Sequence, residues 1–380
     1  MKLNFIGDIT EVSEGLAILA PDYGFEVCEA GLTTKVCKGD GLAVSYNGKE
    51  ASITYNKRCE FFRALGLLLE KTADGESSFD IKEKAFFDTC GGMVDLSHGA
   101  LMNVDAIKSC LRKMAMMGLN MFLLYREESY HVPEYEYFGY MHGRHTDAQI
   151  KEIDDYAYAL GIEIIPAIQC LGHLASVLQW GQFAEIKDTR DCLLVGEEKT
   201  YEFIECMLKA AMRPLRTKRV HIGFDETMSL GTGAYRAKHG MVAREDIFCE
   251  HLKRVADICR RLGYQHAVDT VHGLFSKGLE IYSVASDACI LTFVFRKDLL
   301  GASFKILDID LIVTSVPKPR KAPYNSDVTR MRILYYLVCV GRSEIVPYDY
   351  LVHFKLHHIV EISAIVVYNV PPRPKTSVLY

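Results

Sequence analysis

Residues 220–229, VHIGFDETMS, decide how the rest of the chain is interpreted. An apolar, partly β-branched run leads to Gly223 and Phe224 and then to two adjacent carboxylates, Asp225 and Glu226. This order predicts a buried parallel strand that carries acids at its C-terminal end, where (β/α) barrels place their chemistry. Side chains alternate along a strand, but both acids can turn toward one cavity where the strand gives way to a loop. One acid is then free to hold a substrate while the other moves a proton.

The region around this stretch alternates strand-like and helical patterns. Strand-like segments occur at 91–97, 119–125, 162–169 and 219–226, and helical patterns lie near 103–117, 147–160, 198–214 and 244–262. Such alternation is typical of parallel βαβ units. Four units make half a barrel, so we expect an α/β protein whose catalytic domain, residues 86–380, is a (β/α)8 TIM barrel.

The first 85 residues show a different pattern, which predicts a small α+β domain. Short strand-like pieces are separated by turn signals, and Asn47 and Gly48 are expected to supply the two positive φ angles of a tight hairpin. Residues 59–71 place Phe62, Leu65, Leu68 and Leu69 at helical spacing. We expect this domain to precede the barrel.

The βα pattern is clear only to about residue 265. Of the 28 glycines, only four lie in the last 115 residues. The glycines that usually mark the loops between strands and helices are therefore largely missing there. Apolar strand-like runs persist, but helical patterns fade. Two interpretations stay open: the second half of a barrel with shortened helices, or a segment that is out of frame or replaced. The C-terminal half is therefore expected to be divergent or incomplete.

Composition limits the classes of partner and compartment. A net charge of -5 implies neither a nucleic acid nor an anionic membrane as partner. The 12 cysteines are scattered and form no CxxC pair, so reduced thiols are expected. The N-terminal residues lack the apolar run of a secretion signal, which predicts a cytoplasmic protein. No nucleotide or flavin motif is present, so no cofactor is expected, and the sequence leaves the oligomeric state open.

Two neighbouring carboxylates with different duties suit glycoside cleavage. One acid protonates the leaving oxygen, and an oxocarbenium-like centre must be stabilised. In ordinary hydrolases the second carboxylate stands across the sugar, at least about 5 Å away. Sequence neighbours at one strand end seldom reach that arrangement. The pattern therefore favours a nucleophile supplied by the substrate itself, its 2-acetamido oxygen.

These residues resemble glycoside hydrolase family 20, the β-N-acetylhexosaminidases. Its strand-four motif, HxGxDE, is matched by His221, Gly223, Asp225 and Glu226. The segments GGMVDLS, LYREESY and LGIEIIPAIQCLGHL precede it in the family's order, and the intracellular bacterial branch is the most similar. The resemblance covers about residues 55–265 and implies an exo-acting retaining enzyme. It would act on a small glycan or glycoside and remove terminal GlcNAc or GalNAc.

The resemblance also implies a role for each matching residue. Asp225 would hold the acetamido N–H and stabilise the developing oxazolinium, while Glu226 would act as general acid and then as base. His173, in the LGH that follows the third strand, would brace the site. Glu127 or Glu128, at the end of the second strand, would be the acidic partner of that histidine, and His221 belongs to the motif itself.

Two departures from the family support a second hypothesis. The arginine expected near the first strand is replaced by His98, and the family's acetamido-enclosing tryptophans are reduced to one, Trp180, which lies before strand four. Residues 267–275, AVDTVHGLF, stand where a tryptophan-bearing strand is expected. The alternative is thus a non-catalytic or impaired relic of the family. A third hypothesis is a metal-dependent barrel enzyme that uses His221, Asp225 and His173.

Overall fold

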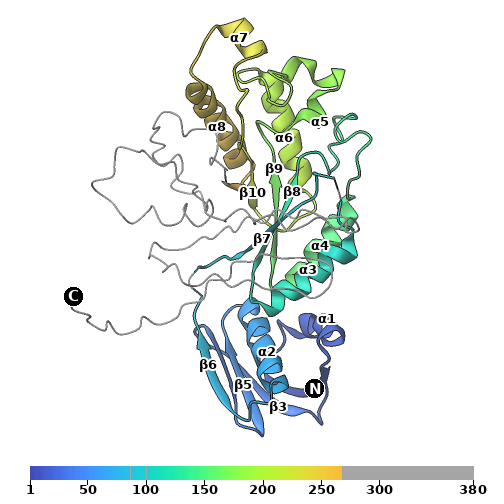
Figure 1. Ribbon diagram of the computed structural model, residues 1–380, viewed down its shortest axis with the longest axis vertical. Coiled ribbons are helices and arrows are strands. Elements are labelled where there is room, and N and C mark those ends of the chain that lie inside the picture. Colours follow the sequence, from blue (N-terminus) through green and yellow to red (C-terminus); the bar gives the residue numbers. More distant parts are fainter. Residues whose placement is uncertain (86, 100, 268–380) are drawn as a thin grey trace, which may run out of the picture.

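Figure 1 shows a chain that forms two sheets, one in each of two units. The structure is a computed structural model that describes residues 1–85, 87–99 and 101–267. The predictions made for residues 268–380, including most of the segment 267–275, lie outside the described residues. The expectation of a divergent or incomplete C-terminal half of the barrel, beyond about residue 265, falls on those residues.

The N-terminal unit is a mixed six-stranded sheet with two helices. Its elements are β1 (Lys2–Gly7), α1 (Ser13–Tyr23), β2 (Glu26–Val27), β3 (Leu32–Lys38), β4 (Leu42–Tyr46), β5 (Glu50–Tyr55), α2 (Arg58–Ala73) and β6 (Phe79–Glu83). The strand order is β2-β1-β3-β5-β4-β6. Pairing is parallel from β2 to β5, while β4 runs antiparallel to both β5 and β6.

The hairpin predicted at residues 47–48 joins β4 to β5, but its turn differs from the expectation. Gly48 has a φ of +86°, whereas Asn47 does not adopt a positive φ. Instead, the Asn47 Oδ1 accepts hydrogen bonds from the N–H groups of Lys49 and Glu50, at 2.9 and 2.8 Å. The prediction of two left-handed residues was wrong because the Asn47 side chain closes the turn as an Asx turn.

The second unit is a parallel sheet with helices between its strands. Its elements are β7 (Gly91–Asp95), α3 (Val104–Met116), β8 (Met121–Arg126), α4 (Asp147–Ala159), β9 (Glu163–Ile168), α5 (Ala175–Leu178), the 3-10 helix η1 (Gly181–Ile186), α6 (Glu198–Met212), β10 (Arg219–His221), α7 (Ala234–His239), α8 (Arg244–Arg261) and β11 (Gln265–Ala267). The order β11-β10-β9-β8-β7 follows the chain, and every pairing is parallel. This arrangement is the consecutive βα winding of a TIM barrel and confirms the predicted fold class.

Alternation along these strands divides the apolar residues between two faces of the sheet. Met121 and Leu123 of β8 cluster with Ile165 and Ala167 of β9 on one face. The residues between them in sequence, such as Phe122, pack on the other face in the core shared with the helices. The first face is the barrel interior, and it carries the candidate site at the C-terminal ends of the strands.

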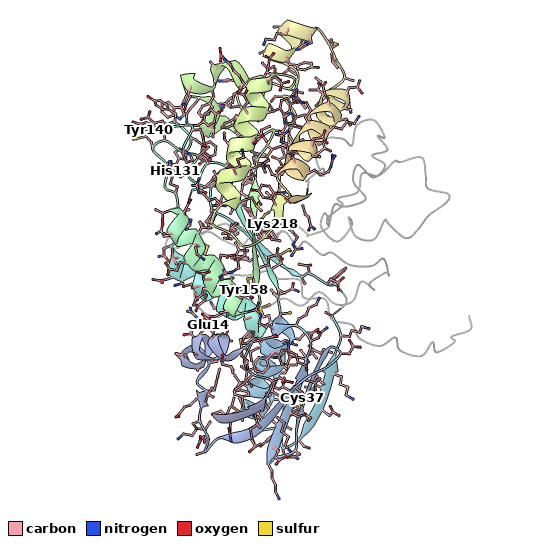
Figure 2. The ribbon with its side chains drawn as sticks, turned by 180° about the vertical axis from the view of Figure 1, so that it is seen from behind. Glu14, Cys37, His131, Tyr140, Tyr158 and Lys218 are labelled. Atoms are coloured by element: carbon pink, nitrogen blue, oxygen red, sulfur yellow. The ribbon has the colours of Figure 1, made fainter. Side chains whose placement is uncertain are left out.

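The two units share a continuous core. The stripe predicted for α2 is present, with Phe62, Leu65 and Leu68 fully buried, and α2 packs on both β4 and α3. Figure 1 shows α1 and α2 of the N-terminal unit (blue) next to α3 of the barrel. Tyr158 of α4, labelled in Figure 2 near this junction, stacks on the guanidinium of Arg58 at 4.0 Å. The N-terminal unit therefore braces the barrel through α3 and α4.

Candidate active site

The candidate site begins where the inward row of apolar side chains ends. Asp95, Tyr125, Ala167 and His221 lie side by side in the register of β7, β8, β9 and β10. Two residues further along, the same inward side carries polar groups, because side chains repeat every second residue in a strand. The C-terminal rim thus changes from an apolar floor to a polar layer, as a substrate site requires.

The chain after β10 has an unusual backbone that sets the directions of the two acids. Regular strand geometry ends at His221, earlier than the predicted 219–226. Gly223, Phe224 and Glu226 then adopt φ angles of +73°, +87° and +49°. Non-glycine residues reach this region at a cost of about 1–3 kcal/mol each. The left-handed turns break the alternation of side chains, so consecutive acids reach the same imidazole.

Gly223 is required at this turn for a second reason. A Cβ at position 223 would lie 2.0 Å from the Gln169 Oε1. That oxygen accepts a hydrogen bond from the Phe224 N–H at 3.3 Å. The glycine therefore allows the Gln169 amide to lie directly against the turn that presents Asp225.

Asp225 is held by two neighbours from the loop after β9. The Gln169 Nε2 donates to its Oδ1 at 2.7 Å, and the His173 Nε2 lies 3.1 Å from its Oδ2. Burial alone would raise the pKa of Asp225, but the contacts with His173 and Gln169 outweigh it and hold the pKa below the ordinary value. Asp225 is therefore ionised at neutral pH and has a fixed orientation.

His173 contacts both acids of the motif. Its Nε2 is 3.7 Å from the Glu226 Oε2, and its Nδ1 is 3.6 Å from the Glu127 Oε1. The contact with Asp225 is an ion pair whose angle departs from that of a good hydrogen bond. The Asp225 carboxylate above all, and then those of Glu127 and Glu226, raise the pKa of His173 to about 9 despite its burial. His173 is thus an imidazolium at neutral pH.

Glu127 and two uncharged side chains close a ring with these residues. The Tyr125 hydroxyl donates to the Glu127 Oε1 at 2.9 Å and accepts a hydrogen bond from the Gln169 Nε2 at 2.9 Å. Gln169 in turn donates to Asp225, and Asp225 pairs with His173. The ring Tyr125–Glu127–His173–Asp225–Gln169 fixes each member from two sides. Glu226 lies outside the ring, with 57% of its side chain exposed.

Two predicted site residues, Glu128 and His221, contact groups outside this ring. The Glu128 Oε1 lies 2.7 Å from the His142 Nδ1, so Glu128 ties down the loop after β8 and leaves the pairing with His173 to Glu127. His221 accepts a hydrogen bond from the Gly223 N–H at its Nδ1, at 3.3 Å, which steadies the turn. The structure therefore brings Asp225, Glu226, His173 and Glu127 together.

A second set of contacts anchors the segment that follows the acids. The buried Asp188 carboxylate accepts the N–H groups of Gly231 and Tyr235, at 2.7 and 2.8 Å. Nearby, the Ser229 hydroxyl donates to the Asp191 Oδ1 at 2.8 Å. Since each contact joins residues about forty positions apart, the loop after β9 holds the loop after β10 in place.

The aromatic residues of the loops after β8 and β9 occupy two environments. Tyr130 is buried, with the Arg126 guanidinium 5.1 Å from its ring. Tyr137 and Tyr140 are exposed and pack on Trp180, with ring centroids 5.7 and 5.3 Å from it. Figure 2 shows Tyr140 at the outer margin of the barrel. Trp180 therefore packs in a cluster with two exposed tyrosines.

Within residues 1–85, 87–99 and 101–267, no three His, Cys, Asp or Glu side chains gather as metal ligands would. None of the helices in those ranges combines the length and apolarity needed to cross a bilayer.

Gln169 and Tyr125 belong to the hydrogen-bonded ring around Asp225 and were not predicted from the sequence. Both face inward, because they stand two residues after Ala167 and Leu123 of the interior cluster. Counting every second residue from the apolar floor would have identified them. A glutamine and a tyrosine carry no charge, so the motif of adjacent acids gives no signal for them.

Comparison with known proteins gives the same assignment as the sequence motif. Residues 87–270 match the profile of "Glycosyl hydrolase family 20, catalytic domain". A search of curated proteins found no match. Among solved structures, an exo β-N-acetylglucosaminidase from Vibrio harveyi in complex with N-acetylglucosamine is similar over 70% of this chain and 51% of its own, with 16% identity and a TM-score of 0.59.

Two further solved structures are similar at the same level. The β-N-acetylhexosaminidase from Bacteroides fragilis has 16% identity and a TM-score of 0.57, over 70% of this chain and 62% of its own. The enzyme from Streptomyces coelicolor has 19% identity and a TM-score of 0.57, over 70% and 61%. The chain thus spans between about half and five-eighths of these proteins. At such identity the likeness shows the fold, a TIM barrel.

Proposed function

Because residues 87–270 belong to glycosyl hydrolase family 20, we propose that this chain is an exo-acting, retaining β-N-acetylhexosaminidase that removes terminal GlcNAc or GalNAc. Its substrate is a small glycan or glycoside. Catalysis is substrate-assisted: the 2-acetamido oxygen of the bound sugar attacks its own anomeric carbon. The names of the similar solved enzymes support this class of reaction.

Asp225 acts on the acetamido group. Its low pKa keeps it ionised, so it accepts the acetamido N–H and stabilises the positive charge that develops as the oxazolinium ring closes. Gln169 and His173 hold its two oxygens and leave little rotational freedom. Holding the internal nucleophile in an attacking geometry removes a large entropic part of the barrier.

Glu226 moves the proton. It donates to the leaving oxygen during ring closure and then takes a proton from the water that opens the oxazolinium. Its position outside the ring and its exposed carboxylate suit a group that must reach both a leaving group and a water. The same residue serves both steps because the second step reverses the direction of the first proton transfer.

The observation that carries the proposal is the convergence of both acids on the His173 Nε2, at 3.1 and 3.7 Å. Two carboxylates that meet at one imidazole lie on the same side of the site. That arrangement suits one acid on the acetamido group and its neighbour on the glycosidic oxygen. Within the described residues, this pair of acids does not flank a sugar from two sides, as a general acid and a protein nucleophile would.

The test is release of p-nitrophenol from its β-GlcNAc glycoside by the wild-type chain and three variants. Glu226→Gln should lower kcat by about a hundredfold or more, and Asp225→Asn should lower kcat/KM by about a hundredfold. Glu185→Gln makes the same chemical change at an exposed acid that pairs with Lys199 and should have no effect. Equal activity in all four proteins would rule the assignment out. No turnover by the wild type would favour the relic hypothesis.

We also propose that the enzyme acts in the cytoplasm. The cysteines of the described ranges are all free thiols, which suits a reducing compartment. Fractionation of cells that express the chain tests this location, and recovery outside the cytoplasm would contradict it.

A further inference from the structure

Carboxylates and imidazoles alternate across four successive strand ends of the barrel. The Asp95 Oδ2 lies 2.7 Å from the His98 Nδ1, and the His98 Nε2 lies 3.3 Å from the Glu127 Oε1. Glu127 continues to His173 at 3.6 Å, and His173 to Asp225 at 3.1 Å. The row therefore reads carboxylate, imidazole, carboxylate, imidazole, carboxylate. His98 is its outer imidazole, beyond the ring already described.

The loop after β7 holds His98 in this position. The Asp95 Oδ1 accepts the N–H groups of Ser97 and His98, at 2.8 and 3.1 Å, and closes a tight turn. The imidazole then stacks on the Tyr125 ring, with 6.1 Å between centroids and 15° between planes. Asp95 occupies the Nδ1, so the Nε2 is presented to Glu127. Although 59% of the side chain is exposed, both ring nitrogens face carboxylates.

Glu127 is the buried carboxylate whose charge a protonated His98 would stabilise. Burial raises the pKa of Glu127, while the Tyr125 hydroxyl and the charges of His98 and His173 oppose the rise. The neighbouring Glu128 adds to the rise. In the described part of the chain, no Lys or Arg forms an ion pair with Glu127; its ion-pair partners are the two histidines. An isolated buried carboxylate would take up a proton instead of remaining charged.

We propose that His98 is a positioning residue: its imidazolium keeps Glu127 ionised, and ionised Glu127 holds His173 against Asp225. Both nitrogens of His98 are engaged by carboxylates, so it acts through Glu127 without binding the sugar itself. This inference rests on the proposed function for its effect on catalysis. Its electrostatic part, the coupling of His98 to Glu127, does not depend on any activity.

The catalytic test compares two substitutions in the pH profile of kcat/KM on the p-nitrophenyl β-GlcNAc substrate. His98→Gln removes the cation, so the pKa of Glu127 rises further and the acidic limb should move up by about one pH unit. His98→Arg keeps a cation, so the limb should stay near the wild-type position. If the limb is unmoved in His98→Gln, or moves equally in both variants, the role assigned to His98 is wrong.

The second test follows the His98 ring by 15N NMR titration and needs no turnover. The Glu127 and Asp95 carboxylates raise the pKa of His98 above its ordinary value even though desolvation works against them. Glu127→Gln should lower the His98 midpoint by about one unit. An unchanged midpoint would overturn the inference. A lowered midpoint in a chain that cleaves no glycoside would uphold the coupling and refute the proposed function alone.

Discussion

At the scale of single residues, the site depends on a glycine. Gly223 has a φ of +73°, and a Cβ atom added there would lie only 2.0 Å from the Gln169 Oε1. Gly223→Ala should displace the Gln169 amide and, with it, the Asp225 carboxylate that the amide holds. Because a shift of about 1 Å at a reacting group can cost a hundredfold, kcat/KM on the β-GlcNAc substrate should fall by about that factor. Retention of wild-type activity by a folded Gly223→Ala variant would show that Gln169 does not position Asp225.

His173 supplies a second prediction at this scale. Its pKa of about 9 lies above the ordinary 6.5 because of the Asp225 carboxylate. The ion pairs of His173 should therefore contribute stability that is fully present below about pH 6.5 and is lost as the pH rises through about 9. An NMR titration should place the midpoint near 9 in the wild type and lower in Asp225→Asn. A wild-type midpoint near 6.5 would contradict the described ion pairs.

At the scale of elements, the contact between α2 and α3 joins the N-terminal unit to the barrel. A Cβ at Gly66 of α2 would lie 2.7 Å from the carbonyl oxygen of Met116 at the end of α3. Alanine normally stabilises a helix interior by about 1 kcal/mol relative to glycine, but here the helices must separate. Gly66→Ala should lower the free energy of unfolding by about 1–3 kcal/mol.

The control for this prediction is Gly181→Ala at the start of η1. There the added methyl group meets nothing within 4 Å, and the backbone needs no positive φ. Urea denaturation should show a lower midpoint for Gly66→Ala and little change for Gly181→Ala. Equal midpoints for both variants would mean that α2 and α3 are not in close contact.

The elements themselves were largely predictable from the sequence, since hydrophobic period and length separate strands from helices in this barrel. The segments predicted at 91–97 and 162–169 contain β7 and β9, and the segment at 119–125 covers β8 except its last residue, Arg126. The prediction at 219–226 ran past the end of β10 because left-handed backbone at Phe224 and Glu226 is invisible in the pattern. The acids were found from the HxGxDE motif and His173 from the family resemblance of the LGH segment, whereas Gln169 was missed because its contacts depend on facing inward beside Asp225.

At the scale of the whole molecule, a buried histidine should govern part of the response to acid. His251 of α8 is fully buried, and its Nε2 donates to the Cys170 carbonyl at 2.8 Å. Burial lowers the pKa of His251 from 6.5 to about 4. The unfolded chain therefore binds a proton first as the pH falls. Stability that is complete above about pH 6.5 should be lost toward pH 4, by about 3 kcal/mol.

His251→Gln keeps an amide donor near the Cys170 carbonyl but cannot titrate. Free energies of unfolding at pH 7 and pH 4.5 should differ by about 2 kcal/mol less in the variant than in the wild type. The carboxylates are common to both proteins and cancel in this comparison. An identical loss in both proteins would show that burial does not lower the pKa of His251.

The central proposal for the whole molecule is that the bound sugar provides its own nucleophile, with Asp225 on the acetamido group and Glu226 moving the proton. The most direct measurement is the ratio of kcat/KM for p-nitrophenyl β-GlcNAc to that for the β-glucoside, which lacks the acetamido group. The internal nucleophile predicts a preference of roughly a thousandfold or more for the acetamido sugar. Comparable turnover of the two glycosides would contradict it.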